Sequence, residues 1–281
     1  MQNKFYPKIR EILLHRVLQD YKINKTFRNT KNNYKNFVLL EKSIQKGGSK
    51  LSIKYENEVF IFDELDDPYS SVKSYVLQAK ESDDDCIMIT IDKATNISSI
   101  DNLTSNGIKC SDKLVSEVGK HLIKLTIKLL KENKEKFNIK KIMVSDHSFL
   151  YCKNIKLNIS LADLYTLKYG ITFYGSFGFT PVDRNLKNKF KRNYQIMQKL
   201  KVNDSKLLYY LEKYHKKYNN IDHLLKYINE SKDELLMDSI KYISSKGKFD
   251  DNCKVLNYII PKIFKSNNIT SFHNIQFELD I

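Results

Sequence analysis

The chain has 281 residues and a formal net charge of +15 at pH 7, with 41% hydrophobic and 29% charged residues. This composition is typical of a globular protein of one or two domains and excludes disordered and collagen-like chains. No run of about 18 apolar residues occurs and no apolar core follows the N-terminus, so the sequence predicts neither a membrane-spanning helix nor an export signal.

The first part of the chain predicts one helix and then antiparallel strands. Apolar residues at helical spacing predict an amphipathic helix over 7–22, and a polar Asn/Lys-rich connector follows at 25–36. Alternating segments at 37–44, 51–56 and 58–65 predict a meander of three strands.

Two more strands are predicted at 72–79 and 86–92, joined by an acidic turn. Residues 86–92 form a continuous apolar run, which is typical of a central strand buried on both faces. The polar residues 93–110 read as a loop.

A long helix is predicted over 111–136, with Ser111 as its N-cap. Its apolar residues recur at helical spacing: Val115, Val118, Leu122, Leu125 and Leu129. A strand at 140–146 follows. We expect the strands 86–92 and 140–146 to be neighbours in the sheet, on either side of this helix in the sequence.

The remaining chain changes from α/β to helical character. Residues 149–158 read as a small strand or loop and 161–169 as a short helix, before the aromatic and glycine-rich segment 171–181. Helices are then predicted over residues 185–200, 204–218, 221–229, 232–244 and 252–265. The closing residues 275–281 alternate like a strand that returns to the main sheet.

These elements predict an α/β (α+β) protein with a mixed, mainly antiparallel sheet flanked by helices. We expect an N-terminal helix and connector over 1–36, a domain over 37–185, and a basic helical extension over 186–281. The net charge is +7 for residues 1–36 and +7 for residues 186–281, so both ends favour an anionic partner such as a nucleic acid or an acidic protein.

The element order and the segment Tyr174-Gly175-Ser176-Phe177-Gly178-Phe179 resemble the GNAT superfamily of N-acetyltransferases, whose short helix ends in a Y-x-x-x-G-F motif. In that family a buried fourth strand and the turn after it hold the pantetheine and pyrophosphate of acetyl-CoA. The next strand splays away and opens the cofactor cleft. Residues 160–179 also look like acetyltransferase-like proteins of large DNA viruses, in agreement with a composition that an AT-rich genome favours.

This resemblance implies acetyl-CoA as the cofactor and an amine as the acceptor. It implies Gly119 as a glycine of the pyrophosphate loop and Tyr174 as the acid that protonates the leaving thiolate. Ser116 and His121 depart from the loop pattern, in which a basic residue comes first and a small residue last. The alternative is a non-catalytic protein of the same fold with a degenerate cofactor site, in which Tyr174 is a packed aromatic.

A basic stretch with Lys187, Lys189, Lys191 and Arg192 precedes a Tyr- and Lys-rich helix. Cations neutralise phosphates and rings stack on bases, so this stretch suggests nucleic-acid binding. The alternative is a helix with a solvated lysine face.

Two further patterns have simple readings. Asp146-His147-Ser148 contains the residue types of a hydrolase triad, but adjacent residues do not adopt that geometry easily, so we expect a hydrogen-bonded turn. The four cysteines form no CxxC pair, so we expect reduced thiols and a location in the cytoplasm, or in a virion if the protein is viral.

Overall fold

The computed structural model describes residues 50–65, 71–82, 84–103, 109–111, 117–152, 156–218, 221–245 and 249–281. The helix predicted at 7–22, the connector at 25–36 and the strand at 37–44 lie outside these residues.

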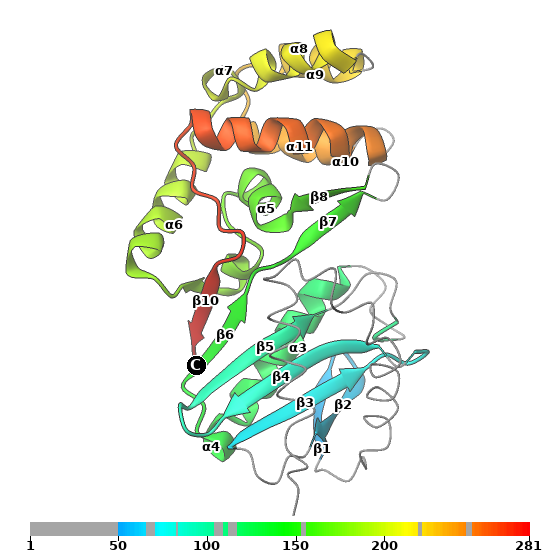
Figure 1. The fold of residues 1–281 in the computed structure, drawn as a ribbon, viewed down its shortest axis with the longest axis vertical. Helices are drawn as coiled ribbons and strands as arrows, with labels where there is room; N and C mark the ends of the chain where they lie inside the picture. The colour runs from blue at the N-terminus through cyan, green and yellow to red at the C-terminus, as the bar shows by residue number, and fades with distance from the viewer. Residues whose placement is uncertain are drawn as a thin grey trace, which may run out of the picture.

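The lower half of Figure 1 is built on one eight-stranded sheet. Its strands in chain order are β1 (Lys50–Tyr55), β2 (Glu58–Leu65), β3 (Val72–Gln78), β4 (Asp85–Asp92), β5 (Ile97–Leu103), β6 (Lys141–Ser145), β9 (Thr180–Pro181) and β10 (Gln276–Asp280). Their order across the sheet is β1-β2-β3-β4-β5-β6-β10-β9. All neighbours are antiparallel except β5 and β6, which are parallel. The predicted mixed and mainly antiparallel sheet is therefore confirmed, including the return of the C-terminal strand.

One strand was not expected, and it changes the order of the sheet. β5 falls in the segment predicted to be a loop, and it lies between β4 and β6, so the expected pairing of strands 86–92 and 140–146 is wrong. The alternation that would identify β5 is broken because Asp101 forms a bulge: Ile89 pairs with Ile100, whereas Met88 pairs with Asn102. A buried polar residue, Ser98, also interrupts its apolar pattern.

The long helix begins later than expected. α3 (Val118–Glu132) is followed by the short α4 (Lys134–Phe137). Ser111 is not the N-cap of α3, because Glu117 holds that position; the Ser111 hydroxyl donates to the Glu58 carboxylate on β2. Leu122, Leu125 and Leu129 are buried, and α3 packs on β1 and β5, as the helical stripe predicts.

The upper half of Figure 1 is mostly helical. It contains the hairpin β7 (Phe149–Cys152) and β8 (Leu157–Ser160), α5 (Leu161–Tyr169), α7 (Val202–Ser205), α8 (Leu207–Tyr218), α9 (Asp222–Glu230), α10 (Leu236–Ser245) and α11 (Phe249–Ser266). The 3₁₀ turn η3 (Tyr174–Phe177) and α6 (Arg184–Met197) connect the two halves. The helices predicted beyond residue 185 are thus confirmed, with shifts of a few residues at their ends.

Each half has its own hydrophobic core. The first core joins the sheet to α3 and includes Phe179, Phe272 and Phe277. The second core is formed by the helices α7 through α11 together with the β7–β8 hairpin and α5. The division between the cores therefore does not follow the sequence, because residues 149–169 pack with the helices and residues 272–281 pack with the sheet.

Two disulfides link the four cysteines, so the expectation of reduced thiols is wrong. Cys86 on β4 is bonded to Cys110, and Cys152 on β7 is bonded to Cys253 on α11. The partners are 24 and 101 residues apart in the sequence, so spacing alone gives no sign of either pair.

Candidate functional site

The candidate site lies at the C-terminal ends of β5 and β6. Residues Ile97–Ile100 pair with Lys141–Val144, and beyond these four pairs β5 continues to Leu103 without β6 as a partner. The bulge at Asp101 lies where this pairing stops. Bulges bend a strand, β6 ends at Ser145, and the ends of β5 and β6 point apart in Figure 1. In α/β sheets such an end, where neighbouring strands diverge, is the usual place for a ligand.

The first turn of α3 provides the next part of the site. Glu117 precedes the helix in the left-handed conformation (φ 51°), and Gly119 is the second residue of the helix. Amide groups in a first turn have no acceptor within the helix and attract anions. The Glu117 carboxylate accepts a hydrogen bond from Lys120, which lowers the pKa of Glu117. A negative side chain therefore stands at the end of the helix that would face a phosphate.

Aromatic side chains of α5 and η3 lie near the same turn. The Tyr165 ring contacts the rings of Tyr169 and Phe173, with centroids 4.8 and 5.3 Å away. Lys120 interacts electrostatically with the Tyr165 and Tyr169 hydroxyl groups. Partial burial raises the pKa of Tyr165, and the nearby ammonium of Lys120 opposes this shift. Together these groups give an aromatic surface beside the Glu117–Lys120 ion pair.

His121 points away from this surface. Its Nδ1 lies 3.2 Å from the Tyr55 hydroxyl and 3.4 Å from a Glu56 carboxylate oxygen, at the turn between β1 and β2. His121, one of the two residues that depart from the loop pattern, is thus held at the β1–β2 turn, and the other, Ser116, lies outside the described residues.

Tyr174 lies between the sheet core and the junction with the helices. Its side chain is 6% exposed and contacts the rings of Phe173 and Phe179, with centroids 5.3 and 6.0 Å away. Burial raises its pKa, and the nearby Asp146 carboxylate raises it further. The hydroxyl group therefore keeps its proton, and the ring is a packed member of the core.

Residues 146–148 form a turn at the end of β6, as the sequence predicts. Asp146 Oδ1 accepts from both the Ser148 hydroxyl and the Ser148 amide, the latter at 3.1 Å. The His147 Nδ1 instead lies 2.8 Å from the Asn274 side-chain oxygen. Since serine bonds to aspartate directly and histidine faces elsewhere, the three residues do not form a triad.

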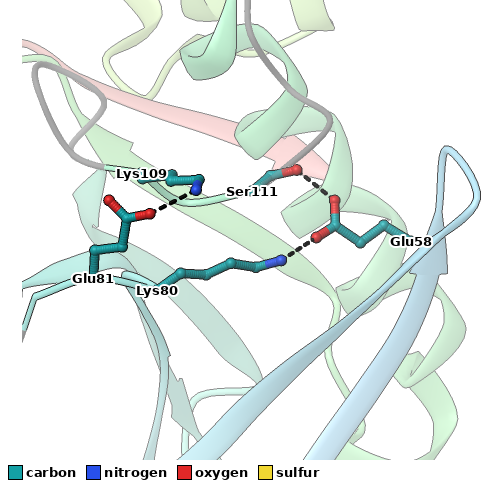
Figure 2. Close-up of polar contacts among 5 residues, drawn as sticks. All are labelled: Glu58, Lys80, Glu81, Lys109 and Ser111. Atoms are coloured by element: carbon teal, nitrogen blue, oxygen red, sulfur yellow. Dashed lines mark hydrogen bonds and ion pairs between the residues drawn. The ribbon is translucent and has the colours of Figure 1, made fainter.

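The segment 109–111, which leads toward α3, is fixed to the sheet by side chains from three places (Figure 2). Lys80 Nζ donates to Glu58 Oε1 at 2.7 Å, and the same carboxylate accepts from Ser111. Lys109 Nζ donates to Glu81 at 2.6 Å. The disulfide of Cys110 adds a covalent link to β4. No feature of the sequence connects these residues, because they are up to 53 positions apart.

The four basic residues predicted to bind nucleic acid all lie on α6, but they differ in environment. Lys187 Nζ pairs with Glu278 on β10 at 2.6 Å. Lys189, Lys191 and Arg192 are exposed. The structure thus presents three of these cations to solvent and uses the fourth to attach α6 to the sheet.

Compared with protein-family models, curated proteins and solved structures, the chain matches none. Within the described ranges, no helix combines the length and apolar character needed to cross a membrane.

Proposed function

We propose that this protein is a GNAT-like N-acetyltransferase that binds acetyl-CoA between the diverging ends of β5 and β6 and acetylates an amine. The observation that carries the proposal is the parting of this parallel pair after Ile100 and Val144, beside a bulge and ahead of α3. The strand in the role of the family's buried fourth strand is then β5, and not residues 86–92 as the sequence suggested.

The fit of acetyl-CoA to these residues has two favourable features and one unfavourable feature. Gly119 lies in the first turn of α3, where its amide can approach a diphosphate, and Lys120 carries a positive charge there that is paired with Glu117. Glu117 opposes binding because it places a carboxylate at the same helix end. When bound, acetyl-CoA would supply the activated acetyl group.

Tyr174 is proposed as the proton donor to the leaving group. Its hydroxyl is protonated at neutral pH, as an acid requires, but burial raises its pKa and so makes it a weaker acid than an exposed tyrosine. Its packing against Phe173 and Phe179 fixes the ring in one orientation.

A second candidate is a non-catalytic protein of this fold that binds a nucleic acid or a viral protein complex. Glu117 at the start of α3 and the nearly complete burial of Tyr174 favour it, because both features hinder acetyl transfer. Cofactor binding separates the two candidates.

The test is calorimetry with acetyl-CoA on the wild type and on two variants. One variant lacks a carboxylate at the N-terminal end of α3, and the other lacks a carboxylate at its C-terminal end. We expect Glu117→Gln to bind acetyl-CoA about twofold to fivefold more tightly than the wild type, because it removes a negative charge from the N-terminal turn. Glu132→Gln makes the same change of charge at the C-terminal end and should leave the affinity unchanged. Absence of heat from folded wild-type protein at ~1 mM ligand would reject the acetyltransferase and leave the second candidate.

The location of the protein is part of this proposal. Disulfides persist in oxidising surroundings, including virions, and are rare in the reducing cytosol. The pairs Cys86–Cys110 and Cys152–Cys253 therefore favour a virion or another oxidising environment over the cytoplasm.

A further inference from the structure

A surface formed by α8 and α11 combines tyrosine rings with lysine side chains. The two helices pack directly, and the Tyr214 and Tyr258 rings join them with centroids 5.3 Å apart. Tyr214 is buried at this contact, whereas Tyr209 and Tyr218 on the same helix are 48% and 50% exposed. The exposed rings are not needed to close the core, so packing alone does not account for them.

Each of three tyrosines on this surface has a lysine ammonium over its ring. Lys213 Nζ lies 4.6 Å from the Tyr209 centroid, and Lys217 Nζ lies 4.9 Å from that of Tyr218. On α11, Lys262 Nζ lies 3.7 Å from the Tyr258 centroid. Lys213 and Lys217 also interact electrostatically with Tyr258, so the six residues form one group across both helices. We call this group the Lys–Tyr surface.

The described side chains of α8 and α11 that carry charge are mostly basic. Among the side chains that the structure describes on these two helices, Glu212 alone is acidic. The exposed basic residues near it are Lys206, Lys216, Lys254 and Lys265. Neighbouring cations repel one another, and the negative charges of a polyanion offset that repulsion. Neutralising those charges also releases the condensed counterions of the polyanion, which favours binding.

The combination of rings and cations selects one class of polyanion. Ammonium groups neutralise phosphates, and aromatic rings provide faces on which unpaired bases stack. The bases of a duplex are already stacked on one another, so a duplex would contact the lysines through its phosphates and would make no stacking contact with the rings. An acidic peptide would likewise use only the charges.

We propose that the Lys–Tyr surface binds single-stranded nucleic acid, with Lys213, Lys217 and Lys262 on phosphates and the exposed rings of Tyr209 and Tyr218 against bases. This site differs from the basic residues of α6. Of those, Lys187 is paired with Glu278, and none has its ammonium or guanidinium group over an aromatic ring within the described part of the chain. The proposal does not depend on acetyl transfer.

The test is fluorescence anisotropy of a labelled oligo(dT) of about 15 nucleotides, measured over a series of salt concentrations. A ring variant, Tyr209→Leu with Tyr218→Leu, keeps the charge and an apolar side chain. We expect it to weaken binding by about fivefold to a hundredfold per ring without a change in the salt dependence. The single variant Tyr209→Leu should also weaken binding without a change in the salt dependence, and it disturbs the fold less than the double variant.

A charge variant and its matched control locate the site. Lys213→Gln, Lys217→Gln and Lys262→Gln together should weaken binding and reduce the log–log salt slope by about 2, or roughly 0.7 for each phosphate contact. The control, Lys189→Gln, Lys191→Gln and Arg192→Gln, removes the same charge from α6 and should have a much smaller effect.

Three results would overturn the proposal. Equal loss in the two charge variants, with no effect of the ring variants, would indicate diffuse attraction by a basic protein. A larger loss in the α6 control would move the site to α6. Binding of poly-glutamate as strong as that of oligo(dT) would show that only charge is recognised.

Discussion

At the scale of single residues, the Asp146 carboxyl is a buried and incompletely hydrogen-bonded group of the described chain. It is fully buried at the junction of the two cores, and its Oδ2 has no hydrogen-bond partner among the described residues. Tyr174, His147 and His273 are close enough to interact with it electrostatically. Burial raises the pKa of Asp146, although Ser148 and the two histidines oppose this effect. A neutral carboxyl is thus favoured in the folded protein more than in the unfolded chain.

Asp146→Asn is expected to change how stability depends on pH. A carboxyl whose pKa is raised by folding stabilises the protein at acid pH, and this contribution is lost as the pH rises through the folded-state pKa. The wild type should therefore lose stability as the pH rises above about 4, the value for an unfolded aspartate. The variant retains an oxygen that accepts from Ser148 and should lack that loss, so it should be at least as stable at pH 7. Urea unfolding at several pH values measures both.

Asp92 provides a control of opposite sign. Hydrogen bonds from Thr95 and the Ala94 amide lower its pKa, so its contribution is present at neutral pH and is lost as the pH falls. Asp92→Asn should be less stable than the wild type at pH 7 and equal to it at low pH. If Asp146→Asn instead behaved like Asp92→Asn, the inferred penalty at Asp146 would be wrong.

At the scale of elements, the sequence predicted those whose pattern is regular and missed those held by distant contacts. The stripe on α3 and the apolar run of β4 were sufficient to identify both. β5 was missed because a bulge at Asp101 and a buried Ser98 break its alternation. Ser111 was assigned as a helix cap because serine favours that position. Its actual partner is Glu58, which is 53 residues away and invisible to local rules.

The same limits apply to the candidate site. Gly119 was correctly placed in a helix, but the parting of β5 and β6 depends on strand pairing, which a sequence without β5 could not give. Lys187 looked like a free cation because its partner, Glu278, lies on a strand 91 residues later.

The Cys86–Cys110 disulfide should stabilise the segment that leads to α3. Closing a loop of 24 residues in the unfolded chain contributes about 3.4 kcal/mol by chain entropy. We expect the pair Cys86→Ala and Cys110→Ala to lower the free energy of unfolding by about that amount. Hydrogen exchange should rise at the amides of 109–111, where the covalent link would be lost and non-covalent contacts such as those to Glu58 and Glu81 would remain. Unchanged exchange there would mean that these polar contacts are sufficient.

At the scale of the whole molecule, the two cores exchange segments of chain. The chain leaves the sheet after β6, forms the β7–β8 hairpin and α5 in the helical half, and returns through η3 to β9. After α11 it crosses back to β10 in the sheet (Figure 1). Asn193 on α6 fixes the last crossing, because its amide donates to the Thr270 carbonyl at 2.7 Å and its oxygen accepts from the Thr270 amide at 3.0 Å. Neither half is therefore a continuous stretch of sequence, and we expect them to unfold together.

The Cys152–Cys253 disulfide tests this cooperativity, because both of its ends lie in the helical core. It closes a loop of 101 residues, and chain entropy assigns it about 4.7 kcal/mol, more than the shorter loop of Cys86–Cys110. If the halves unfold as one unit, the double variant Cys152→Ala and Cys253→Ala should lower the free energy of opening in native-state hydrogen exchange. The decrease should be the same for amides in the sheet and amides in the helices. Destabilisation confined to α8–α11, with the sheet unaffected, would show that the helical half opens alone despite the strands that cross between the cores. The double variant of Cys86 and Cys110 is the matched control, because the two disulfide loops do not overlap in sequence. If the halves unfold as one unit, this variant should lower the free energy of opening at the helix amides as well as at the sheet amides.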